Sequence, residues 1–109
     1  MYRCAVTVFT ALLLSGCGGP EPASTTLASL GNAQLDFSGR HVRVSGTLRS
    51  WDKPLHYWIE NEALDRVALE IDDNLLPPVG TQVTVEGRFI YDRSAGRRIE
   101  VTSLVPAGP

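Results

Sequence analysis

Few residues in this chain of 109 could do chemistry on a bound molecule. The thiols are Cys4 and Cys17 and the imidazoles are His41 and His56, whereas a zinc site needs three or four ligands. The run 72–74 (Asp-Asp-Asn) lacks the acidic spacing of an EF-hand loop, so we interpret it as a turn closed by side-chain-to-backbone hydrogen bonds. No serine stands in a Gly-x-Ser-x-Gly context. We therefore expect no metal, no cofactor and no enzymatic activity.

The charge balance gives little reason to expect a polyanionic partner. Ten Lys and Arg stand against twelve Asp and Glu, a net charge of −2. Domains that bind nucleic acid or anionic lipid by bulk charge are commonly basic. We expect no nucleic acid as a partner.

Apolar and polar residues alternate with a period of two, which is the strand pattern. Alternation of this kind gives each strand one dry face and one wet face, as in antiparallel sheets and small barrels. The loop 92–96 ends in Gly96, which we expect to adopt a positive φ. Five segments show the pattern: 42–49, 55–60, 67–72, 83–89 and 98–102.

Two of these segments share the form Val-x-Val-x-Gly-x-apolar, with Gly46 and Gly87 on the apolar face. A glycine facing inward in mid-strand usually marks a bulge or a sharp coil. Two strands that bend at matching points are typical of a small closed barrel. Chance remains the alternative, because Val and Gly are common residues.

The first segment has the parts of an export signal. Arg3 precedes the apolar run 5–14, which is too short to cross a membrane core, since that needs about 20 residues. The following Leu14-Ser15-Gly16-Cys17 resembles the lipobox of bacterial lipoproteins. This resemblance implies cleavage before Cys17 and acyl chains on that cysteine, which would hold the protein at a membrane. The alternative is an ordinary secretory signal with a chance cysteine.

The resemblance also implies a cellular location. Gly18 stands where an aspartate would favour the inner membrane in Gram-negative lipoproteins, which implies the outer membrane facing the periplasm, or the cell surface in a Gram-positive source. We expect a signal peptide at 1–16, the lipidated cysteine and a flexible Gly/Pro/Ser/Thr-rich tether at 17–36, a β-domain at 37–105 and a tail at 106–109. A short helix within 26–35 is an alternative reading of the end of the tether.

The β-domain resembles an oligonucleotide/oligosaccharide-binding (OB) fold, a five-stranded Greek-key barrel. The phrase Gly-x-x-Val-x-Val-x-Gly carries the resemblance and occurs at 39–46 and 80–87. Many OB folds have a helix between strands three and four that plugs the barrel, and here 73–80 has room for one turn at most. Either Leu75, Leu76 and Val79 cap the barrel, or the segment 27–35 does. The expected class is all-β.

The resemblance directs attention to the face of strands two and three and to the loops after strands one and four. An exposed Trp58 beside cations could stack on a sugar ring or a base, and arginines near the last hairpin could pair with an acidic partner. The alternatives are that both tryptophans cover the barrel rim and that the arginines solvate a hairpin. The candidate ligand-binding residues are Trp51, His56, Trp58, Arg66, Arg93, Arg97 and Arg98.

Three functions compete. The first is a membrane-anchored module that binds an envelope protein or glycan. The second is an accessory or structural envelope lipoprotein without a discrete ligand, and the third is a small cell-wall hydrolase. We expect the first, because the sequence has an anchor motif and no group of catalytic residues. Glu60, Glu70 and Asp72 near the binding face would repel phosphates, which argues against nucleic acid, as does an extracytoplasmic location.

Overall fold

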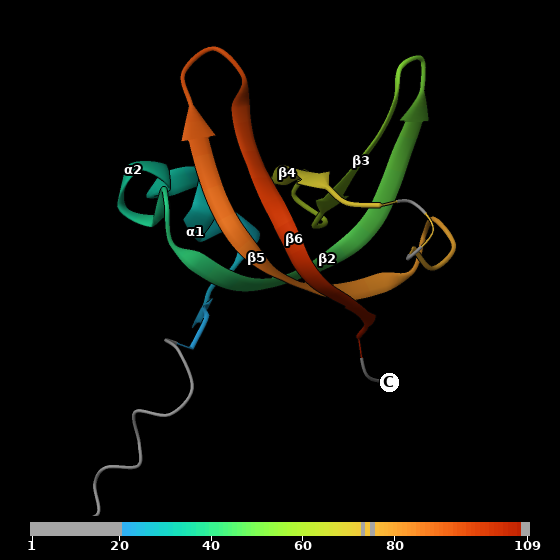
Figure 1. Cartoon of the computed structure of the whole chain (residues 1–109), viewed down its shortest axis with the longest axis horizontal. Coiled ribbons are helices and arrows are strands. Elements are labelled where there is room, and N and C mark those ends of the chain that lie inside the picture. Colours follow the sequence, from blue (N-terminus) through green and yellow to red (C-terminus); the bar gives the residue numbers. More distant parts are fainter. Residues whose placement is uncertain (1–20, 73, 75, 108–109) are drawn as a thin grey trace, which may run out of the picture.

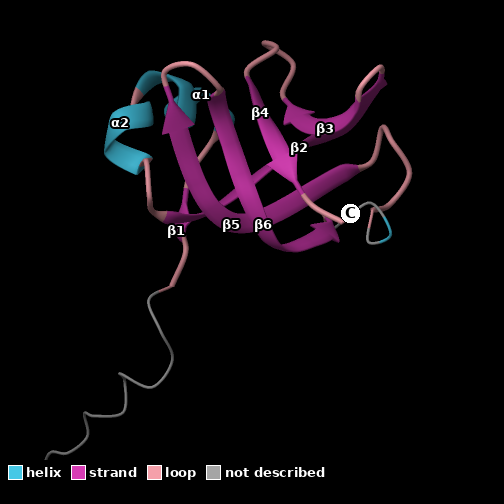
Figure 2. Ribbon diagram, turned by 45° about the horizontal axis from the view of Figure 1, so that its top comes forward, coloured by secondary structure: helices cyan, strands magenta, loops and turns pink. Residues whose placement is uncertain are grey.

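The observed strands coincide with the five alternating segments and extend most of them. The computed structural model describes residues 21–72, 74 and 76–107, and these hold six strands and two short helices (Figure 2). The elements run in the order β1 (Ala23–Ser24), α1 (Leu27–Asn32), α2 (Gln34–Phe37), β2 (His41–Asp52), β3 (Leu55–Glu60), β4 (Arg66–Glu70), β5 (Gln82–Asp92) and β6 (Gly96–Pro106).

The five long strands close into a barrel. β2 pairs antiparallel with β3 through residues 47–52 and with β5 through residues 41–47, so the sheet returns on itself. The remaining neighbours are β3 with β4, β4 with β6 in parallel, and β6 with β5. This order confirms the predicted all-β, OB-like barrel. The two-residue β1 adds a short parallel pairing to the outside of β2.

The core lies inside the barrel and is built from the apolar face of each strand. β2 alternates buried and accessible residues from Val42 to Leu48, as the period of two predicts. Phe89 is the largest side chain buried at the centre. Every buried side chain in the described part of the chain is apolar: Leu27, Leu30, Val42, Val44, Leu48, Ile59, Val67, Leu69, Val83, Val85, Phe89 and Ile99.

Helix α1 plugs the barrel, which decides between the two alternatives for the missing helix. Leu27 and Leu30 belong to the buried core, whereas Val79 is 50% exposed and Leu76 only packs against the core edge. Leu75 lies outside the described residues. Thr26 caps the helix, because its hydroxyl accepts a hydrogen bond from the Ser29 amide at 3.1 Å.

The domain therefore begins earlier than residue 37. Residues 23–37, most of which were predicted to be tether, form β1, α1 and α2 and contribute two core leucines. The leucines of this segment stand among Ser, Thr, Gly and Asn and show no period of two, so the sequence pattern hid its contribution. At the other end β6 runs to Pro106, the first residue of the predicted tail. The predicted signal peptide and Cys17 lie outside the described residues. Within the described part, no helix is both long and apolar enough to cross a membrane.

Gly46 and Gly87 face inward, and each position excludes a larger side chain for a different steric reason. A Cβ at Gly46 would come to 3.0 Å from Leu27 Cδ1 and to 3.1 Å from Ile59 Cβ, so this glycine leaves space for the plug helix. A Cβ at Gly87 would overlap the Glu100 carbonyl oxygen, and the β5–β6 register shifts between Glu86 and Gly87. The bulge predicted from the repeated phrase is thus confirmed at the second glycine.

We expect Leu30→Ala to show that α1 is part of the core. Removing this buried side chain should lower the free energy of unfolding by about 2–5 kcal/mol, because a cavity is left behind. The control is Leu35→Ala, since Leu35 is 77% exposed and should change stability by less than about 0.5 kcal/mol. Urea unfolding followed by circular dichroism measures both. Equal stability of the two variants would contradict the role of the plug helix.

Gly87→Ala should be destabilising by about 1–3 kcal/mol or more, because the new methyl group meets backbone that cannot move away. Gly31→Ala is the matched control. A Cβ there would lie 3.6 Å from Arg97 Nη1, an ordinary contact, and alanine favours a helix over glycine by up to about 1 kcal/mol. Thermal melts should therefore move in opposite directions, and a stable Gly87→Ala protein would contradict the steric argument.

Candidate functional site

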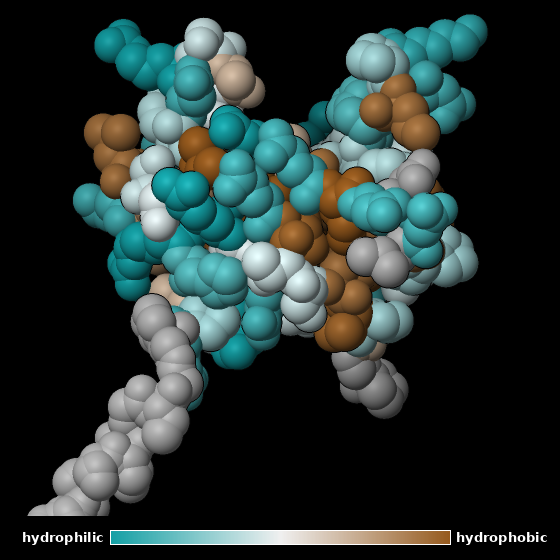
Figure 3. Space-filling view, viewed as in Figure 1, coloured by the Kyte–Doolittle hydropathy of each residue, from teal (hydrophilic) through white to brown (hydrophobic). Residues whose placement is uncertain are grey.

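A groove lies where two hairpins extend beyond the barrel. The β2–β3 and β5–β6 hairpins rise as two arms from the same end of the domain, with β4 between them (Figure 1). Figure 3 shows the surface hollowed between these arms. The groove has a volume of about 450 Å³ and is lined by His56, Trp58, Arg66, Ala68, Tyr91, Gly96 and Arg97.

Trp58 is the centre of a row of flat groups on the outer face of β3 and β4. The His56 ring lies 5.3 Å from the Trp58 ring, tilted by 31°. The Arg66 guanidinium carbon lies 5.3 Å from the indole centroid, within the range of a cation–π contact. His56 Nδ1 lies 2.7 Å from the Pro54 carbonyl oxygen and donates to it, which holds the imidazole beside the indole. The row is thus ordered before any ligand arrives.

Glu60 fixes this row from one side. Its carboxylate accepts the Trp58 Nε1–H at 3.0 Å and forms ion pairs with Arg49 at 3.2 Å and with Arg66 at 3.1 Å. The hydrogen bond from Trp58, together with the two guanidinium groups, holds the pKa of Glu60 below its usual value. The carboxylate therefore stays ionised at neutral pH, and its charge is balanced by two cations.

The β5–β6 hairpin forms the other wall. Asp92 accepts hydrogen bonds from the Ser94 amide at 2.7 Å, the Ser94 hydroxyl at 2.8 Å and the Ala95 amide at 3.1 Å. These bonds, led by that of the Ser94 hydroxyl, lower the pKa of Asp92. Gly96 has a φ of 86°, as predicted for the end of this loop. The loop is therefore preformed, and it presents Arg93 to solvent.

The structure brings four of the seven predicted residues into the groove lining: His56, Trp58, Arg66 and Arg97. Trp51 stands opposite His56 on the adjoining strand, but it is 61% exposed and lies outside the lining. Arg98 is paired with Glu70 at 3.0 Å. Arg93 lies on the hairpin tip above the groove. Four of the seven candidates thus meet in one groove, and Trp51, Arg93 and Arg98 lie outside its lining.

Sequence reasoning missed Tyr91, Ala68 and Gly96. Tyr91 has the same parity in β5 as the buried Phe89, so alternation places it in the core. The hairpin carries it past the end of the barrel, where it is only partly buried and lines the groove. Register was the signal that could have found it, because Tyr91 is the direct partner of Arg97 across β5 and β6.

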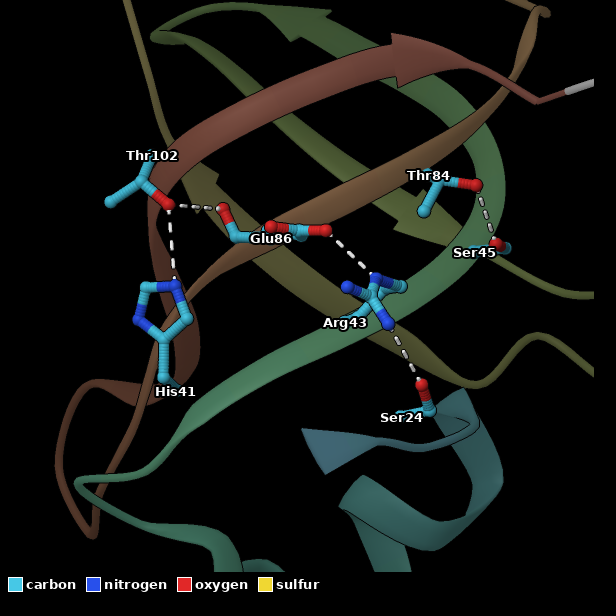
Figure 4. Close-up of polar contacts among 7 residues, drawn as sticks. All are labelled: Ser24, His41, Arg43, Ser45, Thr84, Glu86 and Thr102. Atoms are coloured by element: carbon cyan, nitrogen blue, oxygen red, sulfur yellow. Dashed lines mark hydrogen bonds and ion pairs between the residues drawn. The ribbon is translucent and has the colours of Figure 1, made fainter. Parts of the chain in front are cut away.

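On the outer face of β2, β5 and β6, away from the groove, polar side chains form hydrogen bonds and ion pairs with one another (Figure 4). Arg43 Nε lies 2.7 Å from Glu86 Oε2, and the Ser45 and Thr84 hydroxyls lie 2.9 Å apart. Arg43 also donates to the Ser24 hydroxyl at 3.2 Å, which ties β1 to the barrel. The charged groups Arg43 and Glu86 on this face neutralise each other, which leaves little charge to attract a ligand.

No metal centre is found in the described part of the chain, because no three His, Cys, Asp or Glu side chains there are grouped to hold an ion. The Asn74 amide instead donates to Asp72 Oδ1 at 3.0 Å. This is the side-chain-to-backbone hydrogen bond predicted for that segment.

Comparison with known proteins supports the fold and adds one correction. No family model and no curated protein matches the sequence. Among solved structures, the Schizosaccharomyces pombe Stn1–Ten1 complex contains a similar chain, with a TM-score of 0.61 and 15% sequence identity, covering 83% of this chain and 80% of that one. This likeness shows the OB-like fold.

The same comparison contradicts the expected function and partners. The similar chain is part of the Stn1–Ten1 complex, and this likeness stands against the expectation of an envelope module for a protein or glycan with nucleic acid excluded. The net charge of the chain was a poor guide to its partner, because it counts every carboxylate equally, including those that are paired with arginines. Glu60 and Glu70 are neutralised by ion pairs, and the groove lining itself contains two arginines and no carboxylate.

Proposed function

We propose that this domain binds a short stretch of single-stranded nucleic acid in the groove. The observation that carries the proposal is the composition of the lining: two aromatic rings, one imidazole and two guanidinium groups without a carboxylate, in a chain of net charge −2. A ligand with flat apolar faces and negative charge matches these groups. OB folds use this face for oligonucleotides and oligosaccharides.

The stacking groups account for the bases. Trp58, His56 and Tyr91 present ring surface to one groove, and bases stack on such side chains with little regard to sequence. The groove is lined by both hairpin arms, so a strand lying in it would contact β3 and β4 on one side and β5 and β6 on the other. Binding with weak sequence preference follows from this arrangement.

The acidic residues near the groove do not oppose a phosphate backbone strongly. Arg49 and Arg66 neutralise Glu60, and Arg98 neutralises Glu70. Asp92 is occupied by hydrogen bonds from its own hairpin. Arg93 and Arg97, both on the β5–β6 hairpin, form no ion pair with a carboxylate of the described residues. Lys53 in the β2–β3 loop and Arg40 likewise form none.

Trp58→Ala should weaken binding of a fluorescein-labelled ten-residue oligothymidine by about ten-fold, within the range that loss of one base–aromatic contact causes. Fluorescence anisotropy at low salt measures the affinity, and a thermal melt checks that the variant folds. Trp51→Ala is the matched control, because it removes the indole that lies outside the lining, and it should change affinity less than two-fold. Equal affinities of Trp58→Ala and wild type would contradict the proposal, as would a wild-type protein that does not bind.

A second proposal concerns the location of the protein and is tested separately from the ligand. The lipobox-like 14–17 supports acylation of Cys17 after removal of residues 1–16, and hence a lipid anchor at a membrane surface. The arrangement of the domain is compatible with this anchor. β1, the first described strand, lies at the end of the domain away from the hairpin tips (Figure 2). A chain held through its N-terminal segment would leave the groove open to solvent.

The anchor is tested by intact mass of the protein in the membrane fraction, wild type against Cys17→Ser. We expect the wild-type mass to equal the chain from Cys17 plus acyl groups, and the variant to lack both the cleavage and the added mass. An uncleaved wild-type chain without added mass would contradict the lipid anchor, and the binding proposal would be unaffected.

A further inference from the structure

We propose that Arg97 is the residue that recognises phosphate in the groove, so that the ligand is a phosphodiester chain held at one fixed phosphate. This inference rests on the proposed function and adds to it the group that separates a nucleic acid from an uncharged oligosaccharide.

Neutral oxygen atoms orient the Arg97 guanidinium. Its Nη1 donates to Gln34 Oε1 at 3.3 Å, and its Nη2 donates to the Arg66 carbonyl oxygen at 3.3 Å. Gly31 of α1 lies against the same group, because a Cβ placed there would be 3.6 Å from Nη1. Arg97 is thus held between the plug helix and the start of β4, partly buried, at the groove surface.

No carboxylate within the described residues forms an ion pair with this guanidinium, in contrast to most arginines of the domain. Arg93 also lacks such a partner, but it stands exposed on a loop with nothing to orient it. Arg40 packs on the Phe37 ring. The arginines that do form ion pairs are Arg43 with Glu86, Arg49 and Arg66 with Glu60, Arg88 with Glu100, and Arg98 with Glu70.

An oriented guanidinium without a carboxylate is suited to a phosphate. Arginine has five N–H donors in a planar fork, and the two carbonyl acceptors occupy one donor on each Nη of Arg97 while leaving its charge unbalanced. The remaining donors can meet two phosphate oxygens, the geometry in which such pairs are strongest. Because the side chain is already ordered, little rotamer entropy is lost when the phosphate binds. A neutral sugar would gain nothing from the charge.

The test uses the shortest fluorescein-labelled oligothymidine that wild-type protein binds with full affinity, so that the strand has one register in the groove. Its phosphates are replaced by uncharged methylphosphonates, one position at a time. Wild-type protein should lose about ten-fold in affinity at one position, the effect expected of a charge-assisted contact. Arg97→Gln should bind the unmodified oligomer about ten-fold more weakly and show no loss at that position. The slope of log K against log salt should fall by about 0.7 in the variant.

Arg88→Gln is the control of equal charge, because Arg88 lies outside the lining and is paired with Glu100 at 3.8 Å. It should keep the position-specific loss. Thermal melts check the fold. If Arg97→Gln is unstable, Arg97→Lys keeps the positive charge but loses the fork, and should reduce the position-specific loss. Wild type without any sensitive position, or a position equally sensitive in wild type and in the Arg97 variant, would overturn the inference. Either result leaves the Trp58 test standing, whereas failure of wild type to bind would overturn both.

Discussion

Closure of the barrel is the constraint on which the other features depend. The sheet of five long strands closes because the strands at its two edges, β2 and β5, pair with each other. β2 pairs with β5 through residues 41–47 and with β3 through residues 47–52, so both partners meet it at Thr47. The strand must coil strongly there. Gly46 stands next to Thr47, and Gly87 stands at the register shift between β5 and β6. The short first helix can then enter the barrel end, because Gly46 leaves room for Leu27.

The same closure creates the groove. The pairings that close the barrel use residues 41–47 of β2 and 82–88 of β5, so the rest of both strands is free to continue into hairpins. Those hairpins stand apart as arms (Figure 1), and the outer face of β3 and β4 is left between them. Side chains that would face solvent on a flat sheet, such as His56 and Trp58, therefore line a concavity with Tyr91 and Arg97.

Electrostatics in this domain is decided by pairing and much less by the total count of charges. Most arginines form an ion pair with a neighbouring carboxylate, and Glu60 pairs with two of them. Exposed pairs of this kind add little stability, but they remove negative potential from the groove face. What remains is a positive group at Arg97, oriented by neutral acceptors. A chain with a net negative charge can thus present a surface suited to an anion.

The sequence by itself determined the strands and the all-β class, because the alternation of apolar and polar residues fixes which face of each strand is buried. It also determined the positive φ of Gly96. It also located His56, Trp58, Arg66 and Arg97 on elements that meet. Tertiary structure alone decided which segment plugs the barrel, since Leu27 and Leu30 stand in a run of small residues whose composition is that of a linker. It likewise decided where Tyr91 lies and which charged side chains form ion pairs. Both depend on distances between strands far apart in the chain, which no local pattern encodes.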